Sequence, residues 1–544
     1  MYQLKIIIAL LFPLFFSNNF FSQTKQFEIT FDESIATTKL TGRVFLIISE
    51  TNEVEPRLQK NETQIFGIDV EQISPDSQVI FNEKILGFPL ESIKDIESGD
   101  YYVQAMFNLY TKFSRSDGHT IWAHMDQWEG QDFKISPGNF YSSVLKIHFN
   151  KSIDIIENLV LNKVIPQIEI PEDTEWIKRI KIKSEILTKF WGHPFYLGAT
   201  ILLPKGYYEH PEVEYPVHYI QSHFSLDPLY NFTTNNDEKE NEGYEFYKTW
   251  ISENFPRLIC VLFQHPTPYY DDSYAVNSAN NGPFGDAILS ELIPEIESEF
   301  RIIRKPYARI LSGGSTGGWE ALALQVYHPD FFGGTWVFYP DPIDFSQYGL
   351  INLYEDENAF LVKLSDWRSA DRPMKRTNIG QPKITYREVS RYESVLGSKR
   401  RSGEQLAIWE AVFGPVGNDG YPKPLWDASN GIIDKSVVEY MKNNNYDLKY
   451  YMVKNWNWLG PKLVGKLHFS CGDMDGWYLN LGTYKMEEFL ENEKFPYYNG
   501  SFEYGRPLKG HGWREINDIE LIKKLSNYIL EITPKDELPA KWLY

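Results

Sequence analysis

The sequence predicts an α/β fold for the larger, C-terminal part of the chain, preceded by a domain made of strands alone. From about residue 175 onward, short apolar stretches alternate with segments of helical spacing, which is typical of a mostly parallel sheet covered by helices. Residues from about 26 to 150 instead alternate apolar and polar residues in short runs separated by turn formers, which indicates an antiparallel β-sandwich. A chain of 544 residues is long enough for two or three domains.

The strands expected in the parallel sheet are short and apolar, and they comprise residues 196–203, 215–221, 258–263, 308–312, 334–338 and 466–471. Helices are expected at 285–300, in the segment after Ser315, and at 516–532. Pro294 lies inside the first of these helices, where a proline is expected to cause a kink.

We divide the chain into a signal peptide (1–22), a β-sandwich domain (23–155) and a catalytic α/β domain (170–544). The catalytic domain contains an insertion at 340–460, which is too long for an ordinary loop. We expect a largely helical, lid-like segment over the site. Its basic cluster, Lys399-Arg400-Arg401, is interpreted as a solvated turn rather than an anion site.

The N-terminus has the features of a secretory signal. Lys5 is followed by an apolar run at 6–16, which is too short to span a bilayer and fits a signal peptide cleaved near Ser22 or Gln23. No cysteine follows closely, so a lipoprotein anchor is not expected. The sequence therefore predicts a secreted or periplasmic protein with no membrane span.

Charge and cysteine content narrow the classes of partner. A formal net charge of −20 argues against nucleic acid or an anionic membrane as partner. The two cysteines, Cys260 and Cys471, both lie in apolar strands and are interpreted as buried free thiols, although secretion would permit a disulfide. Two cysteines cannot form a four-cysteine zinc site, and we expect no metal and no other cofactor. Nothing indicates the oligomeric state.

The segment Gly313-Gly314-Ser315-Thr316-Gly317 has the G-x-S-x-G pattern of a nucleophile elbow. An apolar strand precedes it and a good helix former follows it. A serine on such a tight strand-to-helix turn needs small neighbours, because the backbone is strained and closely approached. The pattern therefore predicts that Ser315 is a nucleophile in acyl transfer.

An activated serine needs a base, and the base needs an acid that orients it. The loop after the strand at 466–471 carries Asp473 and Asp475, of which Asp475 is our choice for the acid and Asp473 its close rival; either could be a turn former. His511 lies between two glycines before the last helix and is our choice for the base. The chain order of serine, acid and histidine is that of α/β-hydrolases.

An oxyanion hole needs two N–H donors, which we assign to the backbones of Thr316 and Phe224, with the Phe224 ring near the acyl pocket. Asp272, Asn277 and Trp319 are candidate substrate-binding residues. The polar loop that carries the first two could instead cap the helix starting near residue 285. A calcium site from its carboxylates is conceivable, but the spacing matches no EF-hand.

Four segments carry a resemblance to a known family: Gly198-Ala199-Thr200-Ile201-Leu202-Leu203-Pro204, Tyr215-Pro216-Val217, Ser312-Gly313-Gly314-Ser315-Thr316-Gly317-Gly318-Trp319 and Tyr327-His328-Pro329-Asp330-Phe331-Phe332-Gly333-Gly334. The catalytic half resembles the esterase family that includes enterochelin esterases, S-formylglutathione hydrolases, feruloyl esterases and the mycolyl-transferring antigen proteins. The resemblance covers about 195–340 and 460–530. It implies an α/β-hydrolase fold and a triad of Ser315, Asp475 and His511. The sandwich and the insertion depart from the smaller members, which leaves the substrate open.

The sequence therefore predicts a secreted serine esterase that acts on carboxylic esters through an acyl-enzyme. Acylated carbohydrate is a candidate substrate, given secretion, the sandwich and an aromatic content of 16%. Two alternatives remain open. One is a serine peptidase or acyltransferase of the same fold, and the other is a non-catalytic binding protein on a hydrolase scaffold.

Overall fold

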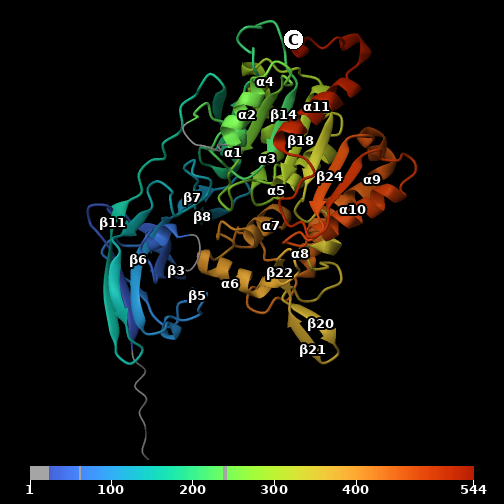
Figure 1. The fold of residues 1–544 in the computed structure, drawn as a ribbon. Coiled ribbons are helices and arrows are strands. Elements are labelled where there is room, and N and C mark those ends of the chain that lie inside the picture. Colours follow the sequence, from blue (N-terminus) through green and yellow to red (C-terminus); the bar gives the residue numbers. More distant parts are fainter. Residues whose placement is uncertain (1–23, 60–62, 237–241) are drawn as a thin grey trace, which may run out of the picture.

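A computed structural model describes residues 24–59, 63–236 and 242–544 (Figure 1). The signal peptide predicted at 1–22, with Lys5 and its apolar run, lies outside the described residues. None of the described helices is long and apolar enough to cross a lipid bilayer.

The N-terminal part is a nine-stranded sheet in the order β4-β1-β11-β9-β6-β2-β3-β5, with β10 paired to β6. Its strands are β1 (Lys25–Phe31), β2 (Leu40–Ser49), β3 (Gln64–Ile73), β4 (Val79–Phe81), β5 (Gly87–Phe88), β6 (Gly99–Leu109), β9 (Phe140–Ser142), β10 (Leu145–Phe149) and β11 (Ile155–Val164). Hydrogen bonding joins all of them into one sheet, so the described residues do not show the two separate sheets of the predicted sandwich. β11 also extends this sheet beyond the boundary predicted at residue 155, and it pairs with β1 in parallel.

A hairpin from the N-terminal part packs into the core of the C-terminal part. Its strands are β7 (Thr111–Ser114) and β8 (Thr120–Ala123). Phe113 is fully buried, and its ring packs on Trp191 with ring centroids 5.1 Å apart. The hairpin therefore belongs to the apolar core of the C-terminal part, whereas the N-terminal sheet has a separate apolar core.

The C-terminal part contains an eight-stranded sheet in the order β12-β13-β15-β14-β18-β19-β24-β25. Its strands are β12 (Ile177–Lys183), β13 (Tyr196–Leu202), β15 (Ile259–Gln264), β14 (Val217–Gln221), β18 (Arg309–Gly314), β19 (Gly334–Phe338), β24 (Leu467–Gly472) and β25 (Ser501–Gly505). The pairs β12–β13 and β13–β15 are antiparallel, and every later pair is parallel. The α/β prediction is confirmed, and each of the six predicted strands has its counterpart in this sheet.

The helices of this part cover the sheet and form the insertion (Figure 1). They are α1 (Glu185–Trp191), α2 (Glu242–Trp250), α3 (Phe284–Ala287), α4 (Ile293–Glu299), α5 (Thr316–Tyr327), α6 (Tyr386–Leu396), α7 (Gln405–Phe413), α8 (Lys435–Asn443), α9 (Leu448–Leu463), α10 (Asn480–Asn492) and α11 (Asp518–Ile532). A π-helical segment, η4 (Ile288–Leu292), joins α3 to α4, and Pro294 lies in the first turn of α4. The irregularity that Pro294 predicts thus takes the form of a π segment just before it.

Short elements complete the fold. Three two-stranded hairpins pair β16 (Asn277–Ser278) with β17 (Gly282–Pro283), β20 (Leu361–Ser365) with β21 (Arg368–Asp371), and β22 (Pro373–Arg376) with β23 (Pro382–Thr385). The 3-10 turns are η1 (Pro56–Leu58), η2 (Ile93–Asp95), η3 (Leu229–Asn231), η5 (Pro306–Ala308), η6 (Phe345–Gln347), η7 (Lys535–Glu537) and η8 (Lys541–Leu543). Cys260 and Cys471 are free and buried, as predicted.

The insertion between β19 and β24 is attached to the N-terminal sheet, because α6 packs on β3 and β5. Arg43 of β2 donates from Nε to the carbonyl of Val395 at 2.9 Å. Arg401 pairs with Asp69 of β3 at 2.6 Å, with only 3% of its side chain exposed. Arg400 pairs with Glu410. The prediction of a solvated basic turn is therefore wrong for Arg400 and Arg401, since their carboxylate partners come from other elements.

Candidate active site

Ser315 lies on a strained turn between β18 and α5. Its φ of 58° and ψ of −121° are unusual for a residue with a side chain. The turn is possible because its neighbours are glycines. A Cβ at Gly313 would lie 2.0 Å from the carbonyl oxygen of Gly317, and a Cβ at Gly317 would lie 2.1 Å from that of Gln221. The backbone thus has the geometry of the nucleophile elbow that the motif predicts.

His511 is bound to Asp475, one of the two candidate acids. Its Nδ1 lies 2.7 Å from Oδ2 of Asp475, which is fully buried. The other oxygen of Asp475 accepts the backbone N–H groups of Trp477 and Leu479 at 2.8 and 3.3 Å. Asp473 instead accepts the backbone N–H of Lys509 at 3.0 Å. The structure therefore brings Asp475, and not Asp473, to His511.

Ser315 and His511 line the same cavity, which has a volume of about 200 Å³. Its other lining residues are His223, Asp341, Gly349, Met374, Tyr386, Gln405, Trp409, Trp477 and Leu479. Most of these come from the insertion or from the loop after β24, so the insertion forms one wall of the cavity. His223 and Asp341 add a second imidazole and a carboxylate beside the serine.

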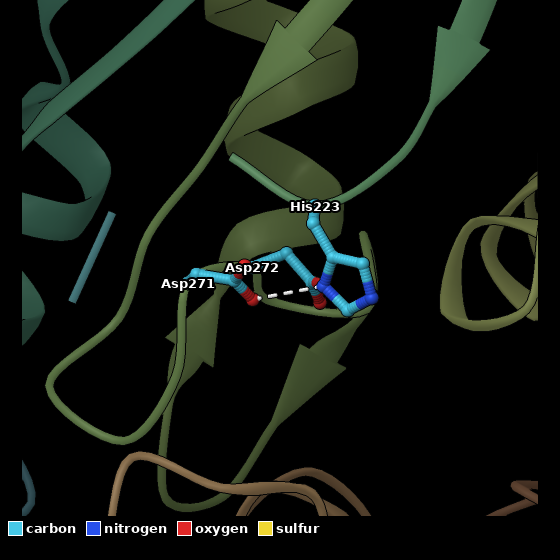
Figure 2. A group of neighbouring side chains, drawn as sticks. All are labelled: His223, Asp271 and Asp272. Atoms are coloured by element: carbon cyan, nitrogen blue, oxygen red, sulfur yellow. Dashed lines mark hydrogen bonds and ion pairs between the residues drawn. The ribbon is translucent and has the colours of Figure 1, made fainter. Parts of the chain in front are cut away.

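The second imidazole, that of His223, is held by two aspartates from the loop after β15 (Figure 2). Its Nδ1 lies 3.1 Å from Oδ1 of Asp271 and 3.6 Å from Oδ2 of Asp272. Burial lowers the pKa of His223, but the two carboxylates outweigh burial and raise it to about 9. Burial and the charge of Asp271 raise the pKa of Asp272 to about 8. Burial and the charge of Asp272 likewise raise the pKa of Glu320 on α5.

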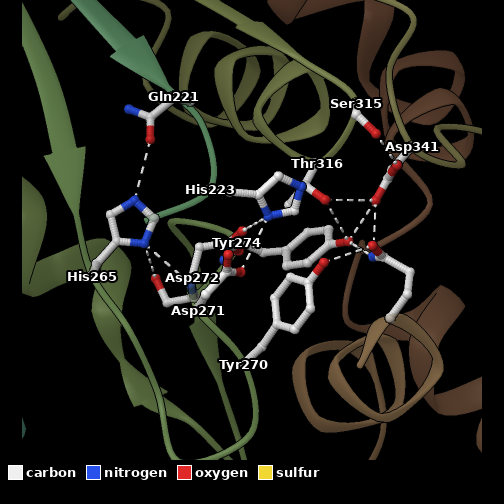
Figure 3. A network of polar contacts seen from close by, with 12 residues as sticks. Gln221, His223, His265, Tyr270, Asp271, Asp272, Tyr274, Ser315, Thr316 and Asp341 are labelled. Carbon is white, nitrogen blue, oxygen red and sulfur yellow. Dashed lines mark hydrogen bonds and ion pairs between the residues drawn. The ribbon is translucent and has the colours of Figure 1, made fainter. Parts of the chain in front are cut away.

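Asp341, three residues after the end of β19, holds the hydroxyl of Ser315 in this structure (Figure 3). Oγ of Ser315 donates to Oδ1 of Asp341 at 3.3 Å. Among the described residues no hydrogen bond joins Ser315 to His511. Asp341 and His511 both line the cavity with Ser315, and rotation about χ1 is the motion by which the serine hydroxyl changes direction.

The other oxygen of Asp341 accepts from four donors in three parts of the chain, and Figure 3 labels two of the donors, Tyr274 and Thr316. Oδ2 accepts from the Tyr274 hydroxyl at 2.5 Å, Oγ1 of Thr316 at 3.1 Å, Nε2 of Gln405 at 3.1 Å and Nε1 of Trp409 at 3.3 Å. Gln405 and Trp409 belong to α7, so this carboxylate joins the insertion to the nucleophile elbow. Burial and the negative charge of Asp341 raise the pKa of Tyr274, which keeps it a donor.

Neither of the residues assigned to the oxyanion hole, Thr316 and Phe224, is among the lining residues of this cavity. Thr316 is the first residue of α5, where backbone N–H groups are free of intrahelical partners and favour negative charge. Phe224 follows β14 as predicted, but its ring packs edge-on against Trp128 of the N-terminal part at 5.3 Å. The Phe224 ring, which we expected near the acyl pocket, therefore does not line the cavity, whereas the neighbouring His223 does.

The three candidate substrate-binding residues do not line this cavity. Asp272 is 1% exposed and accepts the backbone N–H of Tyr274. Oδ1 of Asn277 accepts the backbone N–H of Asp286 in α3 at 3.0 Å, which is the helix-capping role left open above. Trp319 is fully buried, and its ring packs against those of Tyr274 and Phe413. In the structure, Asn277 thus caps a helix and Trp319 packs in the core, so both residues have structural roles.

Comparison with known proteins identifies the part of the chain that carries the elbow. Residues 197–375 match the family described as "Putative esterase". The resemblance to this esterase family is confirmed. The prediction of a serine hydrolase of carboxylic esters is confirmed with it. No curated protein matches the sequence.

Solved structures of esterases resemble the chain at low identity. A ferulic acid esterase has 15% identity and a TM-score of 0.35, with 65% of this chain and 98% of that chain covered. An S-formylglutathione hydrolase from Agrobacterium tumefaciens has 11% identity and a TM-score of 0.31, with 66% and 96% covered. FphF, a fluorophosphonate-binding serine hydrolase from Staphylococcus aureus, has 13% identity and a TM-score of 0.33, with 65% and 98% covered.

We expect Asp341→Ala to destabilise this esterase by about 3 kcal/mol, because the buried Tyr274 hydroxyl and Trp409 N–H would lose their charged acceptor. Urea unfolding at pH 7 measures the change. Asp366→Ala is the matched control, since its side chain is 95% exposed and pairs only with Lys363 in the described structure. Equal stability of the two variants would contradict the bridging role of Asp341.

Proposed function

We propose that the chain hydrolyses carboxylic esters through a triad of Ser315, His511 and Asp475. The observation that carries the proposal is the 2.7 Å contact between His511 Nδ1 and buried Asp475, in a cavity shared with Ser315 on its strained turn. With Nδ1–H donated to Asp475, the neutral imidazole keeps its lone pair on Nε2. That nitrogen is the base available to Ser315.

The proposed reaction proceeds in two stages. Ser315 rotates from Asp341 towards His511, which takes its proton as Oγ attacks the ester carbonyl. The imidazolium, stabilised by Asp475, then returns the proton to the leaving alcohol, and an acyl-Ser315 ester forms. A water molecule, activated by His511 in the same way, attacks this ester and releases the acid and free Ser315.

The N-terminus of α5 supports this assignment of the oxyanion site. The free backbone N–H of Thr316 lies next to Oγ in sequence, and the dipole of a twelve-residue helix favours negative charge there. Phe224 supplies the second proposed N–H from the loop after β14. These donors act on the oxygen that becomes negative in the transition state.

The size and lining of the cavity support a compact acyl group. A volume of about 200 Å³ is small for a whole ligand, so the acyl group would fill it while the alcohol part stays outside. The side chains of Tyr386, Trp409 and Trp477 offer aromatic faces for an apolar or aromatic acyl group. An acylated carbohydrate, with its sugar outside the cavity, fits this division. Secretion of the protein remains part of the proposal.

A fluorophosphonate probe tests the proposal by covalent labelling. We expect one equivalent to label the wild-type chain, and mass spectrometry of the digest to locate the adduct on Ser315. Ser315→Ala should not be labelled, whereas Ser365→Ala, at an exposed position of β20, should react like wild type. A folded wild-type protein that resists the probe would favour the non-catalytic alternative. An adduct on another serine would refute the assignment of Ser315.

A further inference from the structure

A cluster of ionisable side chains beside the cavity takes no part in the proposed reaction. His223 follows β14, and Asp271 and Asp272 lie in the loop after β15, so the carboxyl ends of two neighbouring strands bring them together. Figure 2 shows both carboxylates facing the same ring nitrogen of His223. One ligand atom from each residue lies within 4.8 Å of the other two.

We propose that this cluster binds one divalent transition-metal cation, with Nδ1 of His223 and one carboxylate oxygen each from Asp271 and Asp272 as ligands. Zinc is bound by imidazole nitrogen and carboxylate oxygen at about 2.0–2.2 Å, which places neighbouring ligand atoms roughly 3–4 Å apart. The separations of 3.1 and 3.6 Å between Nδ1 and the two oxygens agree with this geometry. The inference does not depend on the proposed ester hydrolysis.

A buried and unpartnered carboxylate behind the cluster is an independent indication of a cation. Glu320 on α5 is fully buried, and neither of its oxygens has a hydrogen-bond partner among the described residues. Its carboxyl group lies close to that of Asp272, whose Oδ2 faces His223 Nδ1 at 3.6 Å without forming a hydrogen bond. Buried carboxylates are costly unless they are paired, protonated or bound to a metal.

The charge balance of the cluster points the same way. Within the described ranges, the ion pairs of Asp271 and Asp272 are all with His223, and Glu320 forms none. Two carboxyl groups therefore face a single imidazole, and in the described ranges no lysine or arginine pairs with either of them. A divalent cation would hold the two carboxylate oxygens and the imidazole nitrogen together as ligands of one ion.

The kind of donor selects the kind of metal. Calcium and magnesium prefer oxygen ligands alone, whereas an imidazole nitrogen suits zinc and its transition-metal neighbours. Three protein ligands leave a fourth position of a tetrahedral ion open. Binding requires a neutral Nδ1, so the proton that His223 shares with Asp271 is released to solvent as the ion enters. This inference revises the expectation from sequence that the chain holds no metal.

A cation bound to His223 would change the charge of an imidazole ring that lines the cavity. Its second ring nitrogen points away from the aspartates, towards the side where Ser315 and Thr316 lie (Figures 2 and 3). His223 also lines the cavity with Ser315. A cation on Nδ1 withdraws charge from the ring and makes the Nε2–H a stronger donor to negative charge in the cavity.

Zinc titration of the chelator-treated full chain tests the proposal. By isothermal titration calorimetry we expect one tight equivalent of Zn²⁺ in the wild type, and at least about a tenfold weaker affinity in His223→Ala and in Asp272→Asn. His148→Ala is the matched control, since His148 forms an exposed pair with Asp100 at 2.7 Å. This control and Ser315→Ala should bind like wild type, so loss of ester hydrolysis and loss of the metal site are distinguishable.

Three results would overturn the proposal. The first is that the wild type takes up no Zn²⁺. The second is that His223→Ala binds Zn²⁺ as tightly as wild type, which would assign the ion to other histidines. The third is equal affinity for Ca²⁺ and Zn²⁺, which would contradict the role of the imidazole. The His223 side chain is 46% exposed, so this variant should fold, and an unchanged melting temperature of the metal-free variant checks that it does.

Discussion

Ser315→Ala is expected to lower kcat for p-nitrophenyl acetate by about 10⁴- to 10⁶-fold. The substitution removes the only atom that can form the acyl ester in the proposed reaction, while the helix N-terminus and the cavity remain. Serine and alanine both carry a Cβ atom, so the strained φ of 58° at this position is equally costly for either residue. We therefore expect the fold of the variant to persist. Steady-state kinetics of the purified variant measure the loss.

The control for this variant is Ser365→Ala, which removes a hydroxyl from an exposed strand and should leave kcat unchanged. Melting temperatures of both variants should match that of wild type, which separates a chemical effect from unfolding. Full activity of a folded Ser315→Ala variant would refute the proposed nucleophile.

Asp475→Asn is expected to lower kcat by about 10⁴-fold, whereas Asp473→Asn should leave it nearly unchanged. Asp475 accepts from Nδ1 of His511 at 2.7 Å, and its second oxygen is fixed by two backbone N–H groups. An asparagine there can present its NH₂ group to His511, which moves the imidazole proton to Nε2 and removes the lone pair that Ser315 needs. Steady-state kinetics at pH 7 give both values.

Asp473→Asn is a closely matched control, because it makes the same chemical change two residues away in the same loop. Its Oδ1 accepts the backbone N–H of Lys509, and an asparagine oxygen can still do so. A severe loss in Asp473→Asn together with a mild one in Asp475→Asn would reverse the assignment of the acid.

The parts of the fold and site that the sequence predicts are those with a local signature. Apolar runs bounded by turn formers predicted the strand of residues 334–338 with its observed ends, and the strand before Ser315 to within two residues. The elbow is a contiguous motif, and His511 stood out because it lies between two glycines in a loop. These features involve residues that are adjacent in the sequence, so the sequence alone is enough to predict them.

The parts that escaped prediction depend on neighbours in space. Asp341 follows β19 at the same edge of the sheet as Ser315, and its position after a strand was the available signal. Its partners on α7 lie more than sixty residues away in sequence, so nothing local revealed their contact. His223 has no local signal beyond its position next to Phe224, because its interactions are with Asp271 and Asp272, which lie about fifty residues away in sequence. Arg401 was misread for the same reason, since its partner Asp69 belongs to the N-terminal sheet.

The attachment of the insertion to the N-terminal sheet decides what a minimal catalytic fragment of this protein would be. Cutting the chain before the catalytic sheet would strip Asp69 from Arg401 and Arg43 from the carbonyl of Val395. It would also remove Phe113 from the core beside Trp191. The insertion, which lines the cavity, would then keep the hydrogen bonds that join α7 to Asp341. It would lose its contacts with the N-terminal sheet. The N-terminal sheet is in this sense a scaffold for the substrate cavity, and the smallest unit able to hold that cavity in shape is nearly the whole chain.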